Sequence, residues 1–147
     1  KKVVYTSLDF SISVSDVSAT VGQSFNLPVK VKNLGLLADS YYIVVKPLPA
    51  SEPFVEIENG EAYTEIAMTN ETVTVQPRVT VFVKKPIHLD VTVTSMTGSD
   101  LGFELTESKE IEITVSEASM PEFGLLGLIQ IMLIAVALIL KRETLNF

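Results

Sequence analysis

The chain has 147 residues, of which 47% are hydrophobic, and it contains no cysteine. The absence of cysteine excludes a disulfide framework, a thiolate nucleophile and a zinc–thiolate site. The net charge of −7 is uneven: residues 1–122 carry 9 basic against 17 acidic residues (−8), and residues 123–147 carry 2 against 1 (+1). An acidic region without a basic stripe argues against nucleic-acid binding and against docking on anionic lipid.

The N-terminal segment, Lys1 to Tyr5, contains no apolar leader. It favours a mature form whose signal peptide has been removed, with an expression remnant as the alternative.

Residues 1–116 consist of short segments in which apolar and polar residues alternate with period two, the pattern of half-buried β-strands. The predicted strands lie at 8–14, 25–31, 41–45, 55–58, 62–68, 73–75, 79–83, 87–93 and 111–115. Asn59-Gly60 predicts a type I′ hairpin between the fourth and fifth of them. The pattern predicts an all-β sandwich of seven to nine strands and excludes a parallel α/β fold.

Three segments near the N-terminus carry a family resemblance: Phe10–Val14, Thr20–Phe25 and Val29–Gly35. Together they resemble the start of an immunoglobulin-like domain of the CARDB type, found on archaeal and bacterial cell surfaces. In that family a glycine leads into the second strand and an Asn-x-Gly turn leaves it, and Gly22 and Asn33 to Gly35 match. The resemblance implies an immunoglobulin-like sandwich with a role in adhesion or assembly and no catalytic residues to carry over.

The segment from Phe123 to Leu140 has 18 residues and no charge. As a helix it would be about 27 Å long, close to the thickness of a bilayer hydrocarbon core. The basic residues Lys141 and Arg142 follow it and predict a cytoplasmic C-terminus. We therefore expect an extracellular domain (1–116), a short linker (117–122), a transmembrane helix (123–140) and a short cytoplasmic tail (141–147). A buried core helix of a soluble protein is the alternative.

Three residues of the predicted span are candidates for helix–helix contact. Gln130 carries an amide that is costly to leave unpaired in lipid, so it either bonds a neighbouring helix or is simply tolerated. Gly124 and Gly127 would allow a close approach of a partner helix, although they form no GxxxG motif.

The tail also resembles archaeal sorting signals of the PEF type, through Pro121-Glu122-Phe123, the apolar span and Lys141-Arg142. Such signals are processed by a membrane sortase. The tail departs from the pattern because no second proline follows Phe123 and five residues extend past the basic pair. We therefore expect a permanent anchor and an archaeal source.

Catalytic chemistry finds little support. His88 is the single histidine, it falls on the face opposite Ile87 and Leu89, and one imidazole without cysteine cannot build a zinc site. No serine lies in a G-x-S-x-G or S-x-x-K arrangement. We expect no enzyme activity and no cofactor; a glycosidase that uses carboxylates alone is the catalytic alternative, disfavoured because tryptophan is absent.

Carboxylates in predicted loops leave open a weak possibility of a Ca²⁺ site at one end of the sandwich. The candidates are Asp16, Asp39, Asp90, Asp100 and Glu104. A solvated acidic surface is the simpler interpretation, and the glutamates from Glu104 to Glu112 suit a charged strand edge that discourages pairing.

Asn70-Glu71-Thr72 is an N-glycosylation sequon in a predicted exposed connection, so Asn70 is a candidate glycoprotein site. Taken together, the features predict a noncatalytic, single-pass membrane ectodomain. We expect it to be an accessory or structural subunit of a larger membrane or cell-envelope complex, with membrane lipid and envelope proteins as partners. The alternative is a standalone surface module that recognises a glycan or an envelope protein.

Overall fold

The computed structural model describes residues 7–118 and 122–145. Within the second range, the side chains of residues 122–129, 131 and 143–145 lie outside this description. The chain divides into two compact units, Lys1–Glu117 and Ala118–Phe147, and each is described by itself.

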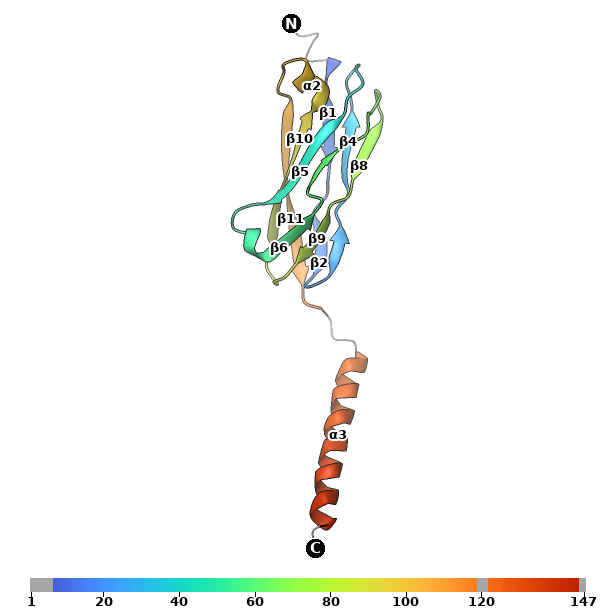
Figure 1. Ribbon diagram of the computed structural model, residues 1–147, viewed down its shortest axis with the longest axis vertical. Helices are drawn as coiled ribbons and strands as arrows, with labels where there is room; N and C mark the ends of the chain where they lie inside the picture. The colour runs from blue at the N-terminus through green and yellow to red at the C-terminus, as the bar shows by residue number, and fades with distance from the viewer. Residues whose placement is uncertain (1–6, 119–121, 146–147) are drawn as a thin grey trace. The chain divides into compact units, whose positions relative to one another are not determined.

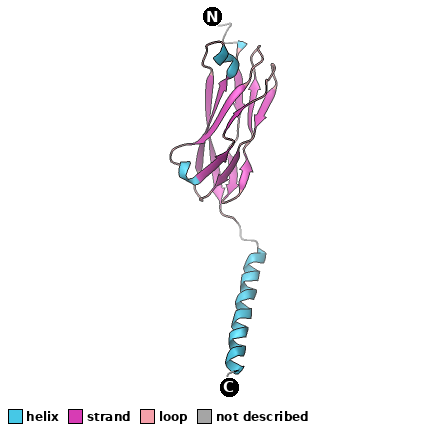
Figure 2. Cartoon of the chain, viewed as in Figure 1, coloured by secondary structure: helices cyan, strands magenta, loops and turns pink. Residues whose placement is uncertain are grey.

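The first unit contains eleven strands among its described residues, together with two short helices (Figure 1, Figure 2). The strands are β1 (Phe10–Ser13), β2 (Val17–Thr20), β3 (Ser24–Asn26), β4 (Val29–Asn33), β5 (Tyr41–Pro47), β6 (Val55–Glu58), β7 (Glu61–Tyr63), β8 (Thr72–Val75), β9 (Arg78–Val81), β10 (Ile87–Ser95) and β11 (Thr106–Ser116). The helices are the 3₁₀ helix η1 (Glu52–Phe54) and α2 (Met96–Asp100), neither of which the sequence pattern predicts.

The strands form three hydrogen-bonded sheets: sheet A (β1-β4-β8), sheet B (β2-β11-β10-β5-β7) and sheet C (β3-β9-β6). Sheets A and C are consecutive parts of one layer, because two-residue breaks ending in Pro28 and Pro77 separate β3 from β4 and β8 from β9. Proline has no N–H for a ladder, and the Leu27 N–H donates to the Pro77 carbonyl instead, at 2.9 Å. With each interrupted strand counted once, the eleven strands become nine, which agrees with the predicted sandwich.

Near the N-terminus the chain passes from one layer to the other, between β1 and β2. β1 pairs antiparallel with β4 in sheet A, whereas β2 pairs parallel with the last four residues of β11 in sheet B. The chain therefore crosses from one layer to the other between Ser13 and Val17. As a result β11 pairs with β10 along Thr106–Ile113 and with β2 along Ile113–Ser116, and the two ladders overlap at Ile113.

The core lies between the layers and is made of the apolar face of each strand. Val29 and Val31 of β4 are fully buried, as are Ile87 and Leu89 of β10, while the residues between them face outward. Burying one such side chain contributes about 1.5–3 kcal/mol before the entropy of ordering is subtracted. The alternation read from the sequence is confirmed along both strands.

The predicted hairpin at Asn59-Gly60 is wrong. β6 pairs with β9 in sheet C and β7 pairs with β5 in sheet B, so the chain changes layers at this turn. Asn59 does have the positive φ of a tight turn, 58°. Gly60 serves a different purpose: a Cβ there would lie 2.7 Å from the Val45 carbonyl oxygen, and Gly60 accepts a hydrogen bond from the Val45 N–H. The following strand is also shorter than the predicted 62–68.

Among its described residues, the second unit contains one helix, α3 (Glu122–Leu145), which starts one residue before the predicted span and continues five residues beyond it. Among the residues that the structure describes, no helix combines the length and the apolar character needed to cross a membrane. The described side chains of α3 are those of Gln130 and of residues 132–142. Within them, large apolar residues such as Met132, Leu133 and Leu140 are exposed.

Candidate functional site: an apolar tip built from three loops

One end of the sandwich exposes a group of large apolar side chains. They come from the loop after β4, from the loop before β8 and from the loop between α2 and β11, and we call them the apolar tip: Leu34, Leu36, Leu37, Ile66, Met68, Leu101 and Phe103. Leu36 is 73% exposed and Ile66 is 69% exposed. In Figure 1 this end carries α2 and lies opposite the end where β11 leads to residue 117. Large exposed apolar side chains that gather at one end of a domain are typical of interaction sites.

Asn33, the last residue of β4, holds the first two loops together. It is only 1% exposed. Its Nδ2 donates to the carbonyl oxygens of Leu37 and Ala67, both at 2.8 Å, and its Oδ1 accepts from the Gly35 N–H at 2.9 Å. The loop of Leu34–Leu37 therefore keeps a fixed distance from the segment that bears Ile66 and Met68. The Asn33 to Gly35 turn expected from the family resemblance is present, and the buried Asn33 side chain connects the two loops by hydrogen bonds.

Asp39 connects the same loops to α2. It is 2% exposed, and its backbone pairs with that of Ala67 in both directions. Its carboxylate accepts from the Ser95 hydroxyl and, at 2.9 Å, from the Thr97 N–H in the first turn of α2. The Ser95 hydroxyl in turn accepts from the Gly98 N–H as the N-cap of the helix. Asp39 thus fixes the position of α2, and with it Leu101 and Phe103.

Tyr41 lies beneath these loops and is fully buried. Its ring packs against that of Phe10, with centroids 5.1 Å apart. Its hydroxyl has no hydrogen-bond partner within the described residues. Burial raises the pKa of Tyr41 well above the ordinary value of 10.0, and the negative charges of Asp39 and Asp9 raise it further. The hydroxyl therefore remains protonated at neutral pH.

The exposed charges within the three described loop segments are all acidic, and exposed Lys32 lies on β4 just before the first of them. The carboxylates are Asp9, Glu65, Glu71, Asp100 and Glu104, and the segments 34–40, 64–71 and 96–105 contain no Lys, Arg or His. An acidic rim repels anionic lipid headgroups and attracts a surface with basic residues. The tip is therefore apolar at its centre and negative at its border.

The carboxylates proposed for Ca²⁺ do not come together. Asp39 is occupied with Ser95 and Thr97, Asp16 accepts from the Glu112 N–H at 2.9 Å, and Asp90 accepts from the Thr92 hydroxyl at 3.0 Å. Asp100 ends α2 and Glu104 is exposed in the next loop. Among the described residues no group of three His, Asp or Glu is arranged to hold a metal ion.

His88 lies on the outward side of β10, as predicted, and its Nδ1 is 3.4 Å from a carboxylate oxygen of Glu110 on β11. Two hydrogen bonds cover the part of β11 that has β10 as its one strand partner. The Asp16 carboxylate accepts from the Glu112 N–H, and the Lys109 ammonium donates to the Val14 carbonyl at 2.8 Å. The charged-edge prediction for Glu104 to Glu112 fits this arrangement, since bonded and charged edges resist pairing with another chain.

Asn70 is exposed in the turn before β8, with φ of 67°, and its N–H donates to the Asn33 carbonyl at 2.7 Å. A glycan on Asn70 would leave the sandwich at the same end as the apolar tip.

In α3, Gln130, Lys141 and Arg142 are exposed. Gly124 and Gly127 lie outside the residues whose surroundings are described, and their role in helix contact stays a prediction.

The tip itself was not predicted from the sequence. Leu34, Leu36 and Leu37 fall in a loop, where apolar residues have no periodic pattern to mark their direction. The available signal was their density: three leucines within four residues directly after a turn, where polar residues usually stand.

No protein-family model and no curated protein matches the chain. Solved structures do resemble it in fold. The C-terminal part of alpha-2-macroglobulin from Escherichia coli, starting at domain MG7, superimposes with a TM-score of 0.57 at 9% identity, covering 75% of this chain and 17% of that one. The secreted serine protease VesC from Vibrio cholerae gives 0.52 at 11% identity, covering 81% and 25%. The chain thus spans a quarter or less of these two proteins.

A CARDB domain from Pyrococcus furiosus, solved in complex with di-metal ions, is also among the similar structures. It covers 76% of this chain and 97% of that one at 15% identity, with a TM-score of 0.45. The similarities to alpha-2-macroglobulin and to VesC establish the fold, a β-sandwich, and nothing of activity. The CARDB relationship, the PEF-type tail and the archaeal source stay predictions.

Proposed function

We propose that the chain is a noncatalytic surface module, held at the membrane by α3, that joins a larger membrane or cell-envelope assembly as an accessory subunit. The observation that carries the proposal is the apolar tip. Three loops are fixed by the buried side chains of Asn33 and Asp39, so the exposed leucines are held in place before any partner arrives. Preorganisation of this kind lowers the entropy lost on binding.

The occupant that suits the tip is a protein surface with an apolar centre and basic residues around it. The acidic rim of Glu65, Glu71 and Asp100 complements such a surface and opposes anionic lipid. The outer location and the cytoplasmic C-terminus belong to the proposal as well. They are supported by the 18 uncharged residues of 123–140 and by the basic pair that follows.

The test is purification of the full chain from native membranes in a mild detergent, with mass spectrometry of the proteins that accompany it. We expect a stoichiometric set of envelope proteins with the unaltered chain and loss of that set with the double variant Leu36→Asp, Ile66→Asp. The matched control is Phe82→Asp, which changes an exposed apolar residue outside the three loops.

Equal recovery of partners with the tip variant and the control would show that the tip is not the contact. Recovery of the chain alone would overturn the subunit proposal and favour the standalone module.

Extraction with alkaline carbonate tests the anchor. We expect the full chain to stay in the membrane pellet and a chain ending at Ser116 to be released. Gln130→Leu separates helix contacts from tip contacts, because it changes α3 and leaves the sandwich intact.

A further inference from the structure

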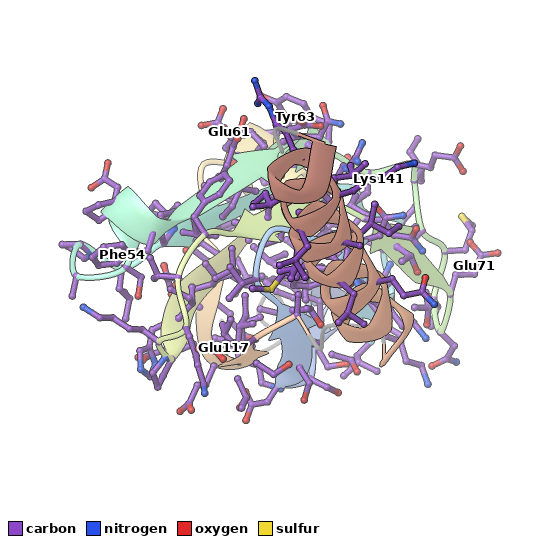
Figure 3. All side chains as sticks on the ribbon, turned by 90° about the horizontal axis from the view of Figure 1, so that it is seen from below. Phe54, Glu61, Tyr63, Glu71, Glu117 and Lys141 are labelled. Atoms are coloured by element: carbon purple, nitrogen blue, oxygen red, sulfur yellow. The ribbon has the colours of Figure 1, made fainter. Side chains whose placement is uncertain are left out.

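A second exposed aromatic feature lies on a different surface, the outer face of sheet B, on strand ends that adjoin the three loops in sequence. Tyr42 of β5 and Tyr63 of β7 stand opposite each other, with ring centroids 4.7 Å apart and planes inclined by 31°. Tyr63 is 70% exposed on the edge strand of the sheet. Figure 3 shows Tyr63 and Glu61 at the same border of the domain. The two neighbouring rings form an exposed aromatic surface that is open to a ligand.

The pair is held rigid by a neighbour on β7. The Tyr42 hydroxyl donates a hydrogen bond to Glu61 Oε2 at 3.0 Å, and this bond raises the pKa of Tyr42. The carboxylate of Glu61 has about four lone-pair sites on its two oxygens, so one accepted bond leaves capacity for others. The two rings and the carboxylate therefore present an apolar surface beside a strong acceptor.

Hydroxyl groups extend this surface across the sheet. The register places Tyr42 opposite Thr94 of β10, and Thr94 opposite Thr106 of β11, with the two threonine hydroxyls 3.0 Å apart. We call Tyr63, Tyr42, Thr94 and Thr106 the tyrosine–threonine row. Four neighbouring strands give it a length of about 14 Å.

A second hydroxyl pair lies one row further along the strands. The hydroxyls of Thr92 and Ser108 are 3.2 Å apart, and Thr92 also donates to Asp90. Each hydroxyl in a pair keeps further acceptor capacity. The outer face next to the tyrosines is thus rich in hydroxyl groups and bordered by the carboxylates of Glu61 and of Asp90, which stands opposite Lys46 in the register.

We propose that the tyrosine–threonine row binds a neutral oligosaccharide. A sugar ring has an apolar C–H face that stacks on an aromatic ring and a rim of hydroxyls that bond to carboxylate and hydroxyl groups, which is the combination this row offers. The carboxylates of Glu61 and Asp90 oppose uronic-acid and sulfated sugars by charge repulsion. The proposal concerns a surface other than the apolar tip and stands independently of the proposed function.

The experiment is saturation-transfer NMR and calorimetry on the full chain in an amine-oxide detergent, which has no sugar headgroup. The probes are short oligomers of glucose, of mannose and of N-acetylglucosamine, with an oligogalacturonate as the acidic comparison. We expect binding of at least one neutral oligomer and no binding of the acidic one. Tyr63→Ser should weaken that binding about tenfold, the loss of one ring stack. The control Phe82→Ser, an exposed aromatic residue outside the row, should leave it unchanged.

Absence of binding by every neutral oligomer overturns the proposal, as does binding that favours the oligogalacturonate. Equal affinity of Tyr63→Ser and unaltered chain also overturns it, even if the variant unfolds at a lower temperature, because the pair would then serve only to hold β7 on the sheet. Co-purifying proteins should be unaffected by Tyr63→Ser, so failure here is separable from failure of the tip.

Discussion

The carboxylate of Asp39 and the hydroxyl of Ser95, 56 residues apart in the chain, share a buried hydrogen bond of 2.5 Å. No basic residue pairs with Asp39 among the described ion pairs. Its charge is instead met by the Ser95 hydroxyl and by an N–H at the start of α2, where the helix dipole favours negative charge.

Replacement of Asp39 by alanine should therefore destabilise the sandwich. The buried Ser95 hydroxyl and Thr97 N–H would lose their acceptor, at a cost of about 2–3 kcal/mol. Urea unfolding followed by circular dichroism measures this change. Asp90→Ala is the control, since Asp90 lies on the outer face of β10 and its carboxylate accepts a hydrogen bond from the Thr92 hydroxyl. Similar unfolding midpoints for both variants would contradict the role given to Asp39.

Asn33→Asp should be strongly destabilising although the two side chains have nearly the same shape. The substitution replaces a donor by an oxygen that faces the carbonyl oxygens of Leu37 and Ala67 in a buried site. We expect a loss of about 2–4 kcal/mol in the free energy of unfolding. Asn26→Asp, at an exposed position of β3, should change it by less than about 0.5 kcal/mol. A small effect at Asn33 would mean that the loops do not depend on it.

Tyr41→Phe should leave the stability at pH 7 unchanged or raise it, since it removes a buried hydroxyl without a described partner. The folded-state pKa of Tyr41 lies above its unfolded value of 10.0, so the protonated form is favoured by folding. Its contribution is complete below pH 10 and is lost above it, by up to about 1.4 kcal/mol per pH unit. Urea midpoints at pH 8 and pH 11 should therefore fall less for Tyr41→Phe than for the unaltered chain; a parallel fall would contradict this.

The sequon predicts a glycan on Asn70 in the protein from its native source. Intact-mass measurement should show a mass above that of the polypeptide, and Asn70→Gln should remove the difference. Thr72→Ala, which keeps the asparagine and destroys the sequon, should do the same. If the native mass equals that of the polypeptide, the sequon is unused and the tip carries no glycan at this turn.

The fold was predictable where burial alone decides it. Val29 and Val31, or Ile87 and Leu89, alternate because one face of each strand packs on the core, and the sandwich follows from many such strands. The hairpin at Asn59-Gly60 was not predictable in the same way. The dipeptide fits a tight turn within one sheet, but the partner of each flanking strand depends on β5 and β9, which are distant in sequence.

Most of the candidate site could not be predicted either, because its residues are brought together by contacts between segments that are distant in sequence. Asp39 was expected in a solvent-exposed loop, and only the long-range pairings with Ala67 and Ser95 bury it. Tyr42 and Tyr63 are separated by 20 residues and become neighbours through the β5–β7 register. Local patterns specify which residues are inside, whereas contacts between loops require the complete topology.

The parallel pairing of β2 with β11 also has a mechanical consequence. Any tension that arrives from residues after Ser116 enters the sandwich along β11, which pairs with β2 over its last four residues and with β10 along Thr106–Ile113. Ladder hydrogen bonds run across the strands, so a pull along β11 loads them in shear, many at once, and does not open them one after another. The strand that leads toward α3 therefore resists such a pull through both of its ladders at once.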